Sequence, residues 1–183
     1  VLRVKVDLPA GTKLILDHFE TKDSQGNYFN NIAGADMTGH TQTDVYISNG
    51  KPAEYRPHFT YHGFRYVEVS EFPGTPTLAN FTGEVVNDDM PLTGTFECDN
   101  PILNQLVKNA FWGIRGNYKG IPLDCPQRDE RQPWLGDHTN GALGESFLME
   151  NGPLYAKWMD DIRDAQREDG CIPDVVPAYY YYY

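Results

Sequence analysis

Apolar and polar residues alternate along the first half of the chain. From Leu2 to Leu8 the apolar residues are separated by charged ones, a period of two that is typical of a strand with one buried face. Similar runs follow at Lys13 to Leu16, Asp44 to Ile47, Phe59 to Val69 and Thr82 to Val86. Turn-forming residues separate them, at Ser24 to Asn27, Ser48 to Gly50 and Pro73-Gly74. The pattern predicts an antiparallel β-sandwich over residues 1–97.

The hydrophobic period then changes to that of helices. Asn100 is a suitable cap before Pro101 at the first helical position, and an amphipathic run follows. A second helix is predicted to begin at Asn151-Gly152-Pro153 and to end at Gly170, with a weaker one over Gly141 to Met149. Residues 98–183 are therefore predicted to be helical. So few helices leave apolar faces uncovered, so most of this helical domain is expected beyond residue 183.

Charge and composition narrow the classes of partner. The net charge of -11 creates a field that repels phosphate backbones, so a nucleic-acid partner is not expected. No apolar stretch approaches the roughly 20 residues of a membrane span, and no targeting segment is recognisable, so the compartment stays open, as does the oligomeric state. Cys98, Cys125 and Cys171 are widely spaced, which favours buried small side chains over a disulfide framework.

A stiff, charged loop over residues 121–137 lies between the predicted helices. Its prolines restrict the backbone and prevent a regular helix. It carries carboxylates, arginines and a tryptophan, namely Asp124, Asp129, Glu130, Asp137, Arg128, Arg131 and Trp134. Burial and like charge raise some carboxyl pKa values while arginines lower others, which is how acid and base roles separate. Salt bridges on a surface loop would explain the same residues, and the spacing alone does not name a reaction.

The run from Asp124 to Arg131, followed by Trp134 and Gly136-Asp137, closely resembles the signature loop of bacterial α-L-rhamnosidases. The resemblance extends through residues 61–69 and 93–98 and covers roughly residues 55–175. The chain departs from the family pattern at Gln132-Pro133, where Leu-Gly is expected.

This resemblance implies a β-sandwich that leads into an (α/α)6 barrel, with the loop at the barrel mouth. Glu130 would be the general acid of an inverting mechanism that releases terminal α-L-rhamnose from an oligosaccharide or glycoside. Asp124 and Asp137 would bind rhamnose hydroxyls, Trp134 would line the sugar pocket, and Arg128 would add a polar contact. The catalytic base in the family is a later glutamate, expected beyond residue 183, and no cofactor is implied.

Two other functions fit parts of the chain. Another (α/α) barrel glycosidase, acting on glucosides or uronides, would share the fold, because fold does not determine the sugar. A carbohydrate-binding β-sandwich would explain the aromatic residues within Phe59 to Val69.

Several other side chains are assigned structural roles. His58, His62 and His138 could be combined with Asp137 as metal ligands, but their spacing matches no metal motif, so no metal site is predicted. Trp112, Trp158, Glu145 and Glu150 are expected to be structural.

Overall fold

The computed structural model describes residues 1–29, 42–128 and 130–178. The chain divides into two compact units, one of Val1–Val86 with Gln127–Asp129, the other of Asn87–Pro126 with Glu130–Tyr183. The units thus separate after Val86, whereas the sequence places the boundary near residue 97. No helix among the described residues has the length and apolar character that a membrane crossing requires.

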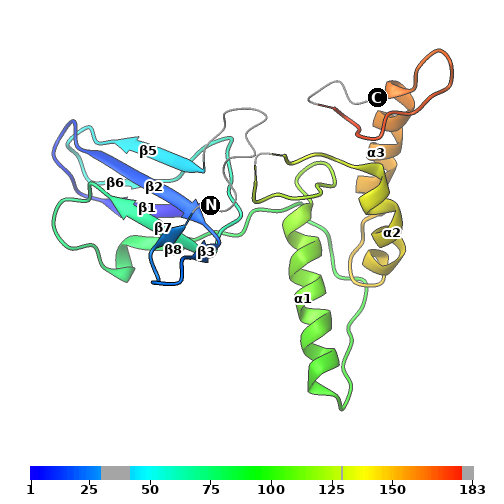
Figure 1. Cartoon of the computed structure of the whole chain (residues 1–183), viewed down its shortest axis with the longest axis horizontal. Helices are drawn as coiled ribbons and strands as arrows, with labels where there is room; N and C mark the ends of the chain where they lie inside the picture. Colours follow the sequence, from blue (N-terminus) through cyan, green and yellow to red (C-terminus); the bar gives the residue numbers. More distant parts are fainter. Residues whose placement is uncertain (30–41, 129, 179–183) are drawn as a thin grey trace. The chain divides into compact units, whose positions relative to one another are not determined.

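The first unit is built from antiparallel strands (Figure 1). One sheet has the order β6-β1-β8 and another the order β5-β2-β7, with a small β3-β4 ribbon beside them. The strands are β1 (Leu2–Val6), β2 (Lys13–Phe19), β3 (Thr21–Lys22), β4 (Tyr28–Phe29), β5 (Thr43–Ile47), β6 (Ala53–Tyr55), β7 (Tyr66–Ser70) and β8 (Phe81–Gly83), with a 3-10 turn η1 (Leu78–Asn80) before β8. The antiparallel β-structure predicted for this half is confirmed.

The core of this unit forms between β1 and β2, the central strands of the two larger sheets. Alternate residues of each strand point inward, and Val4, Leu14 and Leu16 have no exposed surface. They join one buried cluster with Leu2, Val6 and Leu8. Burying such side chains contributes about 1.5 to 3 kcal/mol each. The apolar residues that recur at every second position in the sequence therefore form the core between the two sheets.

The longest predicted strand, Phe59 to Val69, is wrong over its first part. Only Tyr66–Ser70 forms β7, and the residues before it are irregular. Phe59 has a φ of 57°, in the left-handed region that breaks an extended strand, and its side chain is fully exposed. The turn glycines Gly26, Gly50 and Gly74 also have positive φ values, as turn chemistry predicts.

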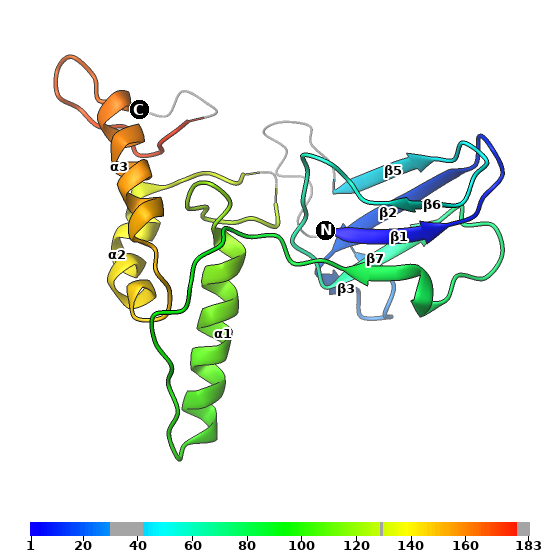
Figure 2. The same cartoon turned by 180° about the vertical axis from the view of Figure 1, so that it is seen from behind.

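Among its described residues, the second unit contains three helices, seen from both sides in Figures 1 and 2. In α1 (Pro101–Asn117) the predicted cap is confirmed, since the Asn100 side chain accepts hydrogen bonds from the backbone N–H groups of Ile102 and Leu103. The helix has no buried residue, and Ile102, Leu106 and Trp112 are exposed. Trp112 was expected to be buried in a core, and that prediction is wrong.

The other two helices differ from their predicted bounds. Helix α2 (Leu135–Ser146) begins earlier than Gly141, and α3 (Gly152–Ala165) ends before Gly170, at the extended residue Gln166. Trp158 and Ile162 of α3 are buried against Val176, and the Trp158 indole donates to the Val176 carbonyl at 2.6 Å. The core position predicted for Trp158 is confirmed.

Candidate active site

The acidic loop is closed on itself by paired hydrogen bonds within the second unit. The Asp124 N–H donates to the Gln132 carbonyl at 2.9 Å, and the Gln132 N–H donates to Asp124 Oδ1 at 2.8 Å. Beyond this closure, the backbones of Trp134 and Val175 form an isolated antiparallel β-bridge, and the Leu135 N–H donates to the Asp174 carbonyl. The chain entering α2 is thereby held by residues that follow α3.

Three of the predicted site residues converge in this loop. The Trp134 indole Nε1 donates to Glu130 Oε1 at 3.1 Å. The Cys125 thiol lies between the two carboxylates, 2.8 Å from Asp124 Oδ2 and 3.5 Å from Glu130 Oε2. Asp124, Glu130 and Trp134 are half-buried, whereas Cys125 is buried. The loop therefore presents two acidic groups held by an indole and a thiol.

The carboxyl groups of Asp124 and Glu130 influence one another. One carboxylate oxygen of each, with the Cys125 sulfur, lies within 4.8 Å of the others. Burial raises the pKa of Asp124, and the nearby charge of Glu130 raises it further, against the hydrogen bonds from Cys125 and Gln132 that lower it. Two carboxylates this close are costly to ionise together, so the pair is suited to holding a proton.

Two other predicted site residues, Asp137 and Arg128, are exposed. Asp137 lies in the first turn of α2 with its side chain exposed. Arg128 is exposed and belongs to the first unit with Gln127. There the loop passes close to Gly63, where an added Cβ would come 2.5 Å from the Gln127 Cβ, so only glycine fits this approach. Asp129 lies outside the described residues.

A buried polar cluster supports the helices of this unit. The Tyr118 hydroxyl, fully buried, donates to Glu145 and lies 2.9 Å from the Tyr155 hydroxyl, which also contacts Glu145 at 3.1 Å. Burial raises the pKa of Tyr118, and burial together with Glu145 raises the pKa of Tyr155 to about 12. Both phenols therefore stay protonated as donors. The structural role expected for Glu145 agrees with these contacts.

The sequence reasoning missed two neighbours of the predicted residues. Cys125 was treated as a small core residue, yet its thiol touches both carboxylates. The Gln132 side chain is fully buried, and neither of its amide atoms has a hydrogen-bond partner among the described residues. Gln132 stands at the departure from the family pattern, which was the one available signal. Of the other cysteines, Cys98 is half-buried and Cys171 is exposed, so the prediction of burial holds only for Cys125.

Two family models match the chain, one over each half. Residues 1–87 match the model of the bacterial α-L-rhamnosidase concanavalin-like domain, and residues 91–183 match that of the bacterial α-L-rhamnosidase 6 hairpin glycosidase domain. The chain belongs to the bacterial α-L-rhamnosidase family. The two matched regions confirm the predicted succession of a β-sandwich and the start of a helical barrel domain.

Individual members of the rhamnosidase family resemble the chain over nearly its whole length. An α-L-rhamnosidase of Streptomyces avermitilis is 42% identical over 97% of the chain, and one of Formosa agariphila is 36% identical over 95%. The chain spans only 17% and 19% of these proteins.

Solved structures of rhamnosidases show the same arrangement of elements. The structure of the Dictyoglumus thermophilum α-L-rhamnosidase has a TM-score of 0.91 at 40% identity, and covers 100% of this chain and 20% of its own. That of the Streptomyces avermitilis enzyme complexed with L-rhamnose has a TM-score of 0.89 at 40% identity, and covers 98% of this chain and 17% of its own.

Proposed function

We propose that the whole protein to which this chain belongs hydrolyses terminal α-L-rhamnosides with inversion, and that Glu130 is its general acid. The observation that carries the proposal is the position of Glu130, held by the Trp134 indole beside Asp124 and Cys125. Family relatives named α-L-rhamnosidase, one of them crystallised with L-rhamnose, support the substrate class.

A general acid must carry a proton at the start of the reaction. The close approach of Asp124 and Glu130 favours one proton held by the pair, because a shared site disfavours two negative charges. On protonated Glu130, the proton passes to the glycosidic oxygen as the bond to the anomeric carbon breaks.

Inversion requires a second carboxylate that activates water on the opposite face of the sugar. The two groups of an inverting pair stand about 6.5 to 9.5 Å apart, which leaves room for the water. Oxygens of Asp124 and Glu130 lie within 4.8 Å, too close for that arrangement. Asp124 is therefore not assigned as the base. The resemblance to the family implies that Asp124 binds the sugar and that the base is a later glutamate beyond residue 183.

The remaining predicted residues complete the sugar site in this proposal. Asp124 and Asp137 accept hydrogen bonds from rhamnose hydroxyls, and Arg128 donates to the sugar. The Trp134 ring supports an apolar face of the pyranose or its C6 methyl group. No cofactor takes part.

The test is the substitution Glu130→Gln in the whole protein, assayed on aryl α-L-rhamnosides with good and poor leaving groups. General acid catalysis contributes about 10² to 10⁴-fold, so turnover of the poor leaving group should fall by that factor, and that of the activated one by less. Glu168→Gln is the matched control, since Glu168 is exposed in the loop after α3. An equal loss on both substrates would remove Glu130 from the acid role.

The anomeric configuration of the first sugar released tests whether hydrolysis proceeds with inversion. NMR spectra taken at early times should show β-L-rhamnose from an α-linked substrate. Release of the α-anomer would indicate retention. The closely spaced Asp124 and Glu130 would then be assigned as the nucleophile and acid pair of a retaining enzyme. Activity of the unsubstituted protein on glucosides or uronides instead would favour another barrel glycosidase. Sugar binding by the unsubstituted protein without hydrolysis of any glycoside would favour a binding module.

A further inference from the structure

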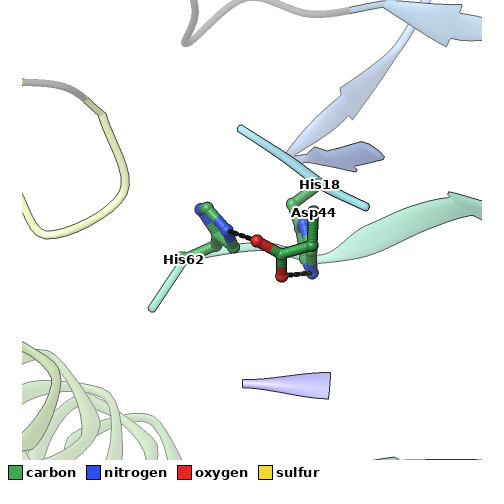
Figure 3. A group of neighbouring side chains, drawn as sticks. All are labelled: His18, Asp44 and His62. Atoms are coloured by element: carbon green, nitrogen blue, oxygen red, sulfur yellow. Dashed lines mark hydrogen bonds and ion pairs between the residues drawn. The ribbon is translucent and has the colours of Figure 1, made fainter. Parts of the chain in front are cut away.

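A second cluster of chemically active side chains lies inside the first unit. His18 is on β2, Asp44 is on β5, and His62 precedes β7. Their exposed fractions are 0%, 8% and 9%, so the cluster is cut off from solvent. Figure 3 shows one nitrogen of each imidazole directed at an oxygen of Asp44, and the two rings stack with their centroids 4.3 Å apart. Burying three polar side chains together costs free energy unless their charges and lone pairs have partners.

Strand pairing brings these residues together. Leu16 of β2 is directly opposite Asp44 of β5, so the two side chains share a face of the sheet. His18, two residues along β2, points to the same inner face as Leu14 and Leu16. A histidine and an aspartate therefore occupy positions that the strand pattern reserves for apolar residues.

Gln42 sets the orientation of both imidazoles. His18 Nδ1 lies 2.9 Å from the Gln42 backbone carbonyl, and His62 Nδ1 lies 3.0 Å from Gln42 Oε1. A carbonyl oxygen only accepts, so each Nδ1 carries a proton. An imidazole that carries its one proton on Nδ1 has its lone pair on Nε2.

The two Nε2 atoms face the two oxygens of Asp44. His62 Nε2 is 2.9 Å from Oδ1, and His18 Nε2 is 4.0 Å from Oδ2. Neither His18 Nε2 nor Asp44 Oδ2 has a hydrogen-bond partner among the described residues. Two electron pairs thus face each other in a buried space, where an unsatisfied polar group costs about 1 to 3 kcal/mol. A cation between them would satisfy both.

We propose that His18, His62 and Asp44 bind a divalent transition-metal ion, of which Zn²⁺ fits best. Two neutral imidazoles and a carboxylate are ligands that Zn²⁺ prefers, and both carboxylate oxygens together with the Nε2 atoms supply four donors. Two bonds of about 2.0 to 2.1 Å to one ion span roughly 4 Å at most. The distances of 2.9 Å from His62 Nε2 to Oδ1 and of 4.0 Å from His18 Nε2 to Oδ2 lie within that limit. Gln42 holds the outer nitrogens, as second-shell carbonyls do for metal-bound histidines.

The ion would have a structural role, because the cluster is buried and ties β2, β5 and the segment before β7 together. The inference is independent of the rhamnosidase proposal, since all four residues belong to the first unit. The competing arrangement is a metal-free pair in which His62 Nε2 carries a second proton and donates it to Asp44 Oδ1.

The experiment uses the whole protein, stripped of metal with a chelator and titrated with Zn²⁺. We expect His18→Gln and Asp44→Asn each to lower the number of tightly bound Zn²⁺ ions by one per chain. Gln42→Ala should weaken the same site about 10 to 100-fold, since it removes one second-shell contact. The matched control is His58→Gln, because His58 is exposed and outside the cluster.

Two further measurements keep the test decisive if a variant does not fold. In the unsubstituted protein, Zn²⁺ should raise the thermal midpoint in a concentration-dependent way. Co²⁺ should give the absorption of a tetrahedral nitrogen and oxygen site without thiolate bands, which separates it from the Asp124, Cys125 and Glu130 group. Unchanged Zn²⁺ stoichiometry in His18→Gln and Asp44→Asn, or a Zn²⁺-independent midpoint with no such Co²⁺ spectrum, would overturn the proposal.

Discussion

The hydrogen bond from Trp134 to Glu130 can be separated from the ring of Trp134 by substitution. Trp134→Phe keeps an apolar ring and removes the N–H that lies 3.1 Å from Glu130 Oε1. A hydrogen bond to a neutral group, as to protonated Glu130, contributes about 0.5 to 1.5 kcal/mol. Both side chains here are half-buried, so water replaces part of it. We therefore expect a loss of about 1 kcal/mol, or about fivefold in kcat/KM.

Trp134→Ala removes the ring as well and should weaken L-rhamnose binding without unfolding the protein. The assay compares kcat/KM on an aryl α-L-rhamnoside with the Kd of L-rhamnose by calorimetry, and circular dichroism checks the fold. Trp134→Phe should change kcat/KM and leave the Kd nearly unchanged. Wild-type turnover by Trp134→Phe would show that the hydrogen bond does not position Glu130, and wild-type rhamnose binding by Trp134→Ala would remove the ring from the sugar site.

Other predictions follow from the same unit. The raised pKa of Asp124 means that the folded chain binds its proton more tightly than the unfolded chain, so stability falls as pH rises from the ordinary value of 3.8 through the folded pKa. Asp124→Asn should therefore raise the thermal midpoint at neutral pH and lose this gain below about pH 3.8; a gain that persists there would contradict the linkage. Tyr118→Phe leaves Glu145 with one of its tyrosine donors and should lower the free energy of unfolding by about 1 to 3 kcal/mol, measured in urea. The 183-residue chain alone should not hydrolyse an aryl α-L-rhamnoside, because the proposed base is a glutamate outside these residues and α1 exposes Leu106; a rate near that of the whole protein would place the base within them.

Local chemistry explains why much of the second unit was predictable. Asn100 before Pro101 specifies a helix start within a few residues, and the cap forms as expected. The far end of α3 was misplaced because the chain leaves the helix at Gln166 and then turns at Gly170, which has a φ of 84°. Gly170 is thus a turn residue and not a helix cap. Trp158 and Ile162 are covered by Val176, which follows α3 in the chain and packs back against it.

The candidate site was likewise predictable from the sequence in part only. The short spacing from Asp124 to Trp134 already placed a carboxylate pair and an indole on one stiff segment, because few residues separate them. The thiol contact of Cys125 and the allocation of Arg128 to the first unit could not be read from spacing, since both depend on how the loop folds.

The sequence by itself determined the elements whose causes are local: alternating strands, the cap of α1, the turn glycines and the composition of the acidic loop. Tertiary structure alone decided which strands pair and what their pairing buries. His18 and Asp44 lie far apart in the chain, and only the register of β2 against β5 places them on one inner face with His62. Their spacing matches no metal motif because the proposed ligands come from separate strands, and strand pairing is a property of the folded sheet.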